Sequence, residues 1–393
     1  MNKKRKIKKG PIIILAIIFI ALIVVSFKLF SKSDNNKKDT KKDNKTEEKK
    51  KPQKPDKPEN KDKRMSVFMV GDVLIHQAIL NDADSDGDGN YEFRSMFSYI
   101  EPMLKKYDLR YCNQESTIGG KNLGISAYPG FNSPDEIGDT LVDMGFNMVS
   151  LANNHTLDRG IQAVNYSNNY WKGKNIITAG TYASEEERNT ITIHEKNGIK
   201  FAFLSYTTIS NATVPNNYIL NMYSNERASA DVTKAKELGA EVIIVAMHWG
   251  TEYTNEETNS QKQIAEYLAN LGVNLIIGAH PHVVEPITYI NDTLVIYSLG
   301  NFISNQLFLN ENAGTGMYAT VDIVVDENGK VTFENLNYEL LLSYMENNSS
   351  VANNSRNFKV IPYSKLTNEM LPNYQAFQSE LESYVERYQE IWN

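Results

Sequence analysis

From Met65 onward, short apolar runs alternate with polar clusters and with segments of helical periodicity. A continuous run of Val, Ile, Leu and Phe is typical of a strand that is buried on both faces. We expect six such strands, at residues 66–70, 108–112, 146–152, 242–247, 273–277 and 293–298. Because helical segments separate them, the pattern predicts an α/β fold.

Two of the segments that precede these strands carry helix signals. Residues 132–145 offer Ser133 as N-cap, Pro134 at the first helical position and Glu136 three residues after the cap. Residues 259–272 have apolar positions at helical spacing and end in Gly272. Residues 316–342, with the turn DENG in the middle, predict a hairpin that extends or flanks the sheet.

The last segment is amphipathic. Its apolar face consists of Phe377, Leu381, Tyr384, Val385, Tyr388 and Trp392. We expect this helix to dock onto the folded part, with binding of a partner as the alternative. The pattern thus predicts a folded domain at residues 65–345 and a C-terminal extension at residues 346–393.

The first thirty residues do not belong to a globular domain. Residues 1–10 are basic, and residues 11–30 form an apolar stretch in which Lys28 is the only charged residue. About 20 apolar residues span the hydrocarbon core of a bilayer as a helix. We expect a transmembrane anchor there, because a cleaved signal peptide, the alternative, has a shorter apolar stretch and a small-residue cleavage site. The positive-inside rule predicts a single-pass protein with a cytoplasmic N terminus and the domain outside the cell membrane.

Residues 31–64 are rich in Lys, Asp and Glu and contain almost no apolar residues. Such a segment cannot bury a core, so we expect a disordered charged linker that acts as a tether. Contact with an anionic wall or capsule polymer is the alternative. Because this linker is basic and the whole chain has a net charge of −7, the domain must be acidic, which argues against nucleic acid as a partner.

Each expected strand is followed by polar residues. In open α/β sheets, ligands collect at the carboxyl ends of strands. The polar residues at these ends are Asp72, Asn113, Glu115, Asn153, Asn154, His155, His248, His280, His282 and Asn301. A lone histidine at a strand end is more often structural, but His280 and His282 lie two apart in GAHPH and can face one cluster.

These residue types predict a metal site. The candidate ligands offer carboxylate, amide and imidazole donors: Asp72, Glu115, Asn154, His248, His280 and His282. This mixed set suits Mn, Fe or Zn better than Mg or Ca, and two ions about 4 Å apart can clamp a phosphoryl group. We expect His155 to act as a general acid or phosphate-holding residue, oriented by Asp158. The residues expected to support the centre are Asn113, Asn153, Trp249, Glu252 and Asn301.

A second acidic cluster comprises Asp84, Asp86 and Asp88, in DSDGDGNYE. It resembles a calcium loop, but an EF-hand needs Glu at position twelve, which here is Ser95. We favour an acidic surface insertion over a calcium site.

The strings VGDVLIH, NQESTIGG, NSPDEIGDTL, VSLANNHTLDRG, MHWGTEY, GAHPHVVEP and YSLGNFI occur in this order over residues 65–303. In combination they resemble the CapA/PgsA family of poly-gamma-glutamate capsule proteins, which is similar to the calcineurin-like metallophosphatases. The resemblance implies a four-layer αββα sandwich of two sheets between helices. It also implies a bacterial cell-envelope role in capsule synthesis, export or anchoring, with an anionic polymer such as poly-gamma-glutamate and other capsule-synthesis membrane subunits as partners.

The resemblance implies ligand roles as well. Asp72 and His282 correspond to ligands of one ion, Asn154, His248 and His280 to ligands of the second, Glu115 to the bridging carboxylate and His155 to the catalytic histidine. Metallophosphatases open with Asp-x-His, whereas here His76 follows Asp72 by four positions, which leaves open whether His76 reaches the first ion. Two alternatives to the capsule role also stay open: a metal-dependent phosphoesterase acting on envelope material, and a polymer-binding module without turnover.

Overall fold

The computed structural model describes residues 62–307, 309, 312–346 and 355–392. The expected cytoplasmic segment and anchor, and nearly all of the expected linker, lie outside the described residues. Over the described ranges, no helix combines the length and the apolar character that crossing a bilayer requires.

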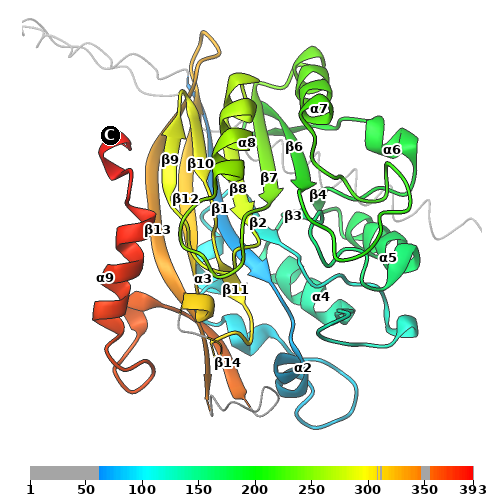
Figure 1. Ribbon diagram of the computed structural model, residues 1–393, viewed down its shortest axis with the longest axis vertical. Coiled ribbons are helices and arrows are strands. Elements are labelled where there is room, and N and C mark those ends of the chain that lie inside the picture. Colours follow the sequence, from blue (N-terminus) through cyan, green and yellow to red (C-terminus); the bar gives the residue numbers. More distant parts are fainter. Residues whose placement is uncertain (1–61, 308, 310–311, 347–354, 393) are drawn as a thin grey trace, which may run out of the picture. The chain divides into compact units, whose positions relative to one another are not determined.

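Two mixed β-sheets form the centre of the fold (Figure 1). The eight-stranded sheet has the order β14-β13-β12-β1-β2-β3-β4, and β11 pairs with β1 outside this path. Its strands are β1 (Lys63–Val73), β2 (Leu109–Asn113), β3 (Met148–Ser150), β4 (Ile177–Ala179), β11 (Asn301–Ile303), β12 (Thr315–Val325), β13 (Val331–Glu346) and β14 (Arg356–Pro362). Strands β1 to β4 are parallel, and β12 to β14 extend the sheet in antiparallel fashion, as the hairpin pattern predicts.

The six-stranded sheet has the order β5-β6-β7-β8-β10-β9. Its strands are β5 (Ile193–Lys196), β6 (Ile199–Thr207), β7 (Val242–His248), β8 (Leu275–Ala279), β9 (Ile287–Ile290) and β10 (Thr293–Ile296). The inner strands are parallel, and the edge strands β5 and β9 are antiparallel to their neighbours. All six strands expected from apolar runs are present, and the expected α/β class is confirmed.

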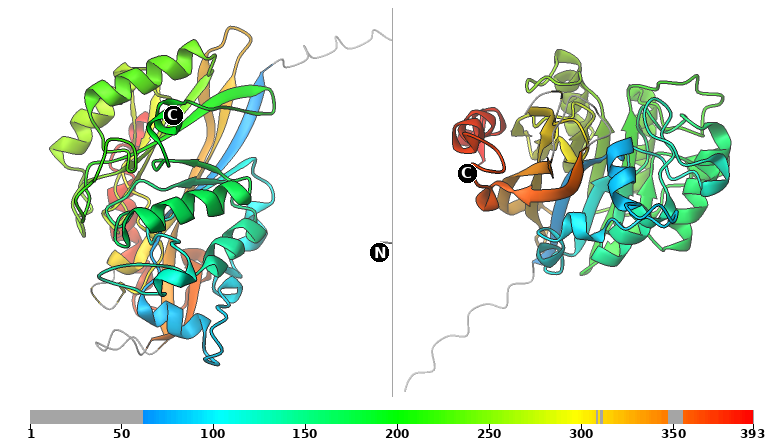
Figure 2. Two further views of the ribbon diagram at one scale, coloured as in Figure 1. Left: turned by 90° about the vertical axis from the view of Figure 1, so that its right-hand side faces the viewer. Right: turned by 90° about the horizontal axis from the view of Figure 1, so that it is seen from below.

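The helices lie outside the sheets (Figure 1 and Figure 2). They are α2 (Gln77–Ala83), α3 (Glu101–Leu104), α4 (Asp135–Met144), α5 (Gly160–Gly173), α6 (Glu185–Asn189), α7 (Asn225–Glu237), α8 (Asn259–Asn270) and α9 (Tyr374–Val385).

Strand alternation divides the core between the two faces of the six-stranded sheet. On β7, Val242, Ile244 and Ala246 belong to the main core shared with the eight-stranded sheet. The intervening Ile243 and Val245 belong to a second core, which includes apolar residues of α7 and α8. Because successive side chains of a strand point to opposite faces, a run that is apolar throughout is buried on both sides.

The expected N-cap at Ser133 is wrong. Helix α4 begins at Asp135, Pro134 occupies the N-cap position, and no side chain caps the helix. The Ser133 hydroxyl instead donates to the buried Ser116 hydroxyl at 2.9 Å. Helix α8, by contrast, has a complete capping box in which Thr258 and Gln261 bond each other's backbone N–H groups.

Both expected domain borders also shift. Strand β1 begins at Lys63, because Lys63 and Arg64 already pair with Val325 and Val324 of β12. At the other end, β14 pairs with β13, so the sheet continues past residue 345. Helix α9 packs beside β13, with Leu381 and Val385 buried in the main core, which confirms the expected docking.

Gly71 allows β1 and β11 to approach next to the polar strand ends. A Cβ atom at this position would lie 1.8 Å from the carbonyl oxygen of Gly300. The following residue, Asp72, donates its backbone N–H to the same carbonyl at 3.0 Å. The lack of a side chain at Gly71 therefore allows the backbone of Asp72 to bond the chain just before β11.

We predict that Gly71→Ala lowers the free energy of unfolding by at least about 2 kcal/mol, because the methyl group must displace the backbone of Leu299 and Gly300, just before β11. Equilibrium unfolding in urea measures this change. Gly173→Ala is the matched control: it lies at the end of α5 with nothing near its Cβ position, so we expect a change within about 1 kcal/mol. Equal stability of the two variants would contradict the prediction.

Candidate metal centre

The polar residues at the strand ends of both sheets meet at one site. Asp72 lies in β1, and Glu115 follows β2. His248 ends β7, and His280 and His282 follow β8 in the other sheet. The His282 ring lies 3.2 Å from Asp72, and the His248 ring lies 3.6 Å from Glu115. The parallel strands thus deliver side chains from both sheets to a shared edge, as the sequence predicts.

The two carboxylates at this site are fully buried but differ in their partners. Asp72 Oδ1 accepts a hydrogen bond from Asn113 Nδ2 at 2.7 Å, and Oδ2 accepts from the His280 backbone N–H at 3.3 Å. Neither carboxylate oxygen of Glu115 has a hydrogen-bond partner among the described residues. Burial raises the pKa of Glu115 well above its usual range, because the charged form is poorly solvated.

The imidazole groups surround Glu115. Glu115, His280 and His282 offer ligand atoms that all lie within 4.8 Å of one another. The Nδ1 atom of His280 is buried and, within the described part of the chain, has no partner. His248 Nε2 lies 2.9 Å from Asn154 Oδ1. Among the described residues, Glu115 and His280 Nδ1 have unused lone pairs, and together with Asn154 and His248 they form a mixed oxygen and nitrogen ligand set that fits a transition-metal ion.

Burial lowers the pKa of all three histidines, but nearby carboxylates reverse the net effect at His282. It lowers the pKa of His248 well below its usual value and, with the nearby His282, lowers the pKa of His280 to about 3. Both rings are therefore neutral at pH 7, the form that binds metals. Burial also opposes the charged form of His282, but Glu115 and Asp72 outweigh this effect and raise its pKa to about 9.

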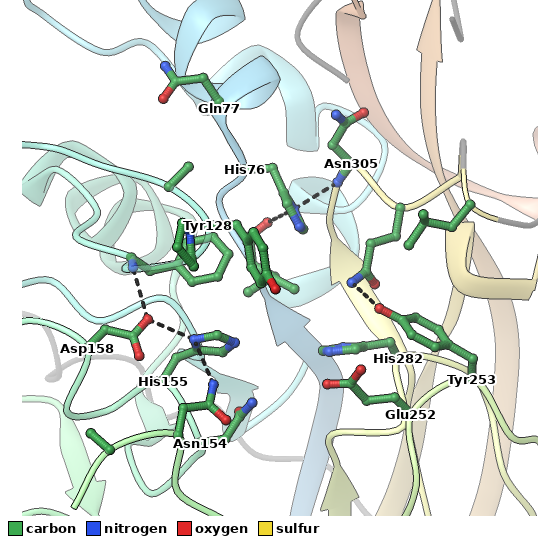
Figure 3. A pocket seen from close by; sticks show the side chains of 18 of the residues that line it. His76, Gln77, Tyr128, Asn154, His155, Asp158, Glu252, Tyr253, His282 and Asn305 are labelled. Atoms are coloured by element: carbon green, nitrogen blue, oxygen red, sulfur yellow. Dashed lines mark hydrogen bonds and ion pairs between the residues drawn. The ribbon is translucent and has the colours of Figure 1, made fainter. Parts of the chain in front are cut away.

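His155 and Asp158 form a second pair beside this cluster (Figure 3). His155 Nδ1 lies 2.7 Å from Asp158 Oδ2, which also accepts the backbone N–H of Phe131 at 2.9 Å. The Phe131 ring packs edge-on against His155, with 4.7 Å between ring centroids. Asp158 therefore holds the imidazole in a fixed orientation, as expected for this residue.

His76 lies in the same pocket as His155 and His282. Its Nδ1 atom lies 3.1 Å from the carbonyl oxygen of Leu74 and 3.2 Å from the backbone N of Asn305. These contacts occupy one ring nitrogen and leave Nε2 for any further ligand. Burial lowers the pKa of His76 to about 3, so its ring is neutral.

The five supporting residues have different surroundings. Asn113 bonds Asp72, and Asn153 accepts the His155 backbone N–H at 2.9 Å. Asn301 Nδ2 donates to the His282 carbonyl at 3.2 Å, and Glu252 lines the pocket. Trp249 lies in the second core instead, where its Nε1 donates to the Tyr297 carbonyl.

Strand-end reasoning missed several residues that line the pocket. They are Tyr128, Phe131, Asn211, Tyr253 and Asn305. All five lie in loops, where no periodicity marks them. Tyr253 adopts a positive φ of 63°, which is unusual for a residue other than glycine but leaves no mark in the sequence.

The acidic loop at Asp84, Asp86 and Asp88 brings three carboxylates within 4.8 Å of one another. Asp86 and Asp88 are exposed, and the loop's own backbone N–H groups donate to all three carboxylates: Gly89 to Asp84, Asp88 to Asp86, and Asn90 to Asp88. This geometry suits a surface turn without an ion, and the calcium alternative stays a prediction.

Comparison with known proteins decides the family. Residues 66–306 match the family model described as bacterial capsule synthesis protein PGA_cap. The chain belongs to this family. It is 26% identical over 312 residues to the PGA biosynthesis protein CapA of Bacillus subtilis (strain 168), covering 78% of this chain and 76% of that one. It is 24% identical over 262 residues to the capsule biosynthesis protein CapA of Bacillus anthracis, covering 63% and 61%.

Solved structures give more distant matches. The calcineurin-like phosphoesterase YfkN from Bacillus subtilis is 16% identical, with a TM-score of 0.45, and the match covers 82% of this chain and 99% of that one. The 5'-nucleotidase precursor from Thermus thermophilus is 14% identical, with a TM-score of 0.42 and coverage of 71% and 54%.

The raised pKa of His282 predicts a pH dependence of stability in the metal-free protein. A histidine whose pKa rises from 6.5 to about 9 on folding stabilises the folded state below pH 6.5, and this contribution is lost as the pH rises through about 9. Unfolding of chelator-treated protein between pH 6 and 9.5 measures it. We expect His282→Asn to lower the free energy of unfolding by on the order of 3 kcal/mol at pH 6 and by much less at pH 9.5. A loss that does not vary with pH would contradict this assignment.

Proposed function

We propose that this chain acts in the synthesis, export or anchoring of a poly-gamma-glutamate capsule through a centre that holds two divalent transition-metal ions. Family membership supports the capsule role, and both CapA relatives carry names from capsule or PGA biosynthesis. We further propose that residues 11–30 anchor the chain in the cell membrane, that residues 31–64 tether the domain outside, and that the two sheets form the four-layer sandwich of metallophosphoesterases.

One observation carries the metal proposal. Three buried polar atoms, both carboxylate oxygens of Glu115 and Nδ1 of His280, lack hydrogen-bond partners among the described residues. A buried carboxylate without donors is costly, and a bound cation removes this cost. Glu115 lies between His248 and His282, at 3.6 and 3.7 Å, which suits a bridging role.

We assign the remaining ligands to the two ions as the family resemblance implies. Asp72 and His282 would hold one ion, and Asn154, His248 and His280 would hold the other. Asn113 fixes the Asp72 carboxylate, and the His280 backbone supports its second oxygen. When bound, such ions polarise a phosphoryl or carbonyl oxygen and lower the pKa of a coordinated water.

We expect His280→Ala to remove at least one metal ion from the purified full-length chain and to reduce capsule production in cells. Metal analysis of the protein and a capsule assay measure the two effects. His194→Ala is the matched control, because His194 is a half-buried histidine of β5 and we predict it to be no ligand. Full metal content and a normal capsule in the His280→Ala strain would contradict the proposal.

A second candidate function is a metal-dependent phosphoesterase that acts on envelope material. The His155–Asp158 pair favours it, because capture of a polymer needs no oriented acid. Asp158 binds Nδ1, so Nε2 is the ring nitrogen left to hold a proton toward a leaving group.

If the phosphoesterase function is correct, His155→Asn lowers hydrolysis of bis(p-nitrophenyl) phosphate by about 10²- to 10⁴-fold while the metal content stays unchanged. Asp158→Asn, which keeps the size of the side chain, should give a smaller loss. Steady-state kinetics of the metal-loaded protein, with metal analysis of each variant, measure these effects. No hydrolysis by the metal-loaded parent protein, or undiminished hydrolysis by His155→Asn, would exclude this function and leave the non-catalytic binding module.

A further inference from the structure

A cavity of about 970 Å³ opens beside the metal centre. His155, Asp158 and Asn154 lie on one side of it, and His282, Glu252 and Tyr253 lie on the other (Figure 3). The cavity is far larger than a phosphate ion needs, so most of its wall is available to contact the rest of a phosphorylated ligand.

The charge of this wall is unusual for a protein that handles an anionic polymer. Among the described residues that line the cavity there is no Lys or Arg, whereas Glu252 and Asp158 are acidic. Arg159 follows Asp158 in the chain, but its guanidinium group donates to the Ser126 hydroxyl and the Leu123 carbonyl. Apart from the histidines at the metal centre, the described wall therefore offers a polyanion no cationic side chain.

The metal centre sets how much negative charge the cavity can accept. Two divalent ions exceed the charge of Asp72 and Glu115 by about two positive charges, which one phosphate group balances. A stretch of poly-gamma-glutamate adds one carboxylate per residue and would place the others against Glu252 or uncharged wall. Repulsion from the like charge of Glu252 and the lack of cationic partners on the uncharged wall both oppose this arrangement.

The uncharged part of the wall combines aromatic rings with amides. Tyr128 is 74% exposed and Tyr253 is 39% exposed, although both line the cavity. The Tyr128 ring packs on Phe131 with 6.4 Å between centroids, and Phe131 in turn packs on His155. Exposed aromatic faces bind the C–H faces of a hydroxylated ring, and the Asn211 amide can bond its hydroxyl groups without adding charge.

We propose that this cavity takes a phosphomonoester of a neutral sugar, with the phosphate at the metal centre and the sugar ring against Tyr128, and that it rejects polyanionic segments. This inference rests on the proposed metal centre. If it is correct, the substrate is a phosphorylated saccharide, and any contact with an anionic polymer is made outside the cavity.

Calorimetric titration of the purified full-length chain in Mn²⁺ tests the proposal with a matched ligand pair, glucose 1-phosphate and glucuronic acid 1-phosphate, which differ in one carboxylate. We expect glucose 1-phosphate to bind about tenfold more tightly. Glu252→Gln should narrow this difference, because it removes the acidic group that faces the extra carboxylate. Equal or tighter binding of glucuronic acid 1-phosphate would overturn the proposal.

The aromatic contact needs its own variants. Tyr128→Ala should weaken the binding of glucose 1-phosphate about five- to tenfold and leave the binding of inorganic phosphate unchanged. Tyr128→Phe should keep the parent affinity for both ligands. Tyr99→Ala, an exposed tyrosine that does not line the cavity, is the control. Unchanged sugar phosphate binding in Tyr128→Ala would overturn the proposal. If phosphate binds but the sugar adds no affinity, the sugar phosphate proposal is wrong and the metal centre stands. If neither metal nor phosphate binds, both proposals are wrong.

Discussion

Glu115 is buried where the two sheets meet, and no donor in the described part of the chain bonds either of its carboxylate oxygens. Asp72 lies close by: His282 Nδ1 is 3.2 Å from Asp72 Oδ2 and 3.7 Å from Glu115 Oε2. Two carboxylates in such a place repel each other and are poorly solvated, so the site needs positive charge. In the metal-free protein His282 supplies it as a cation, which is why its pKa is raised.

The rest of the fold delivers side chains to this point from both sheets. Parallel strands β1, β2 and β3 end on one side of the site, and β7 and β8 end on the other. The chain then crosses from β10 in the six-stranded sheet to β11 in the eight-stranded sheet, where Asn301 pairs with Asp72. Gly71 permits the close approach of β1 to β11. Backbone pairing of β1 with β11 thus holds Asp72 at the place where both sheets contribute side chains.

Much of this arrangement follows from the sequence, because its signals are local. Apolar runs mark strands buried on both faces, and the polar residues after them occupy the shared edge. Predictions failed where a distant partner decides the outcome. Ser133 has the sequence of an N-cap, but Ser116 accepts its hydroxyl. Strand β14, RNFKVIP, alternates too weakly to be recognised, and Tyr128 reaches the pocket from a loop without periodicity.

The C-terminal segment shows how remote contacts complete the site. Glu252 and Tyr253 form one wall of the pocket, on a segment that begins at Trp249 in the second core. A few residues later, the buried side chain of Glu257 accepts hydrogen bonds from Tyr388 at 2.7 Å and from Arg387 at 3.2 Å. Both ends of this segment are therefore held by contacts within the fold, and the Tyr253 hydroxyl accepts a hydrogen bond from Gln306 Nε2 at 3.1 Å. Residues 355–392 thus add β14 to the sheet and two side chains that hold the segment beside the candidate site.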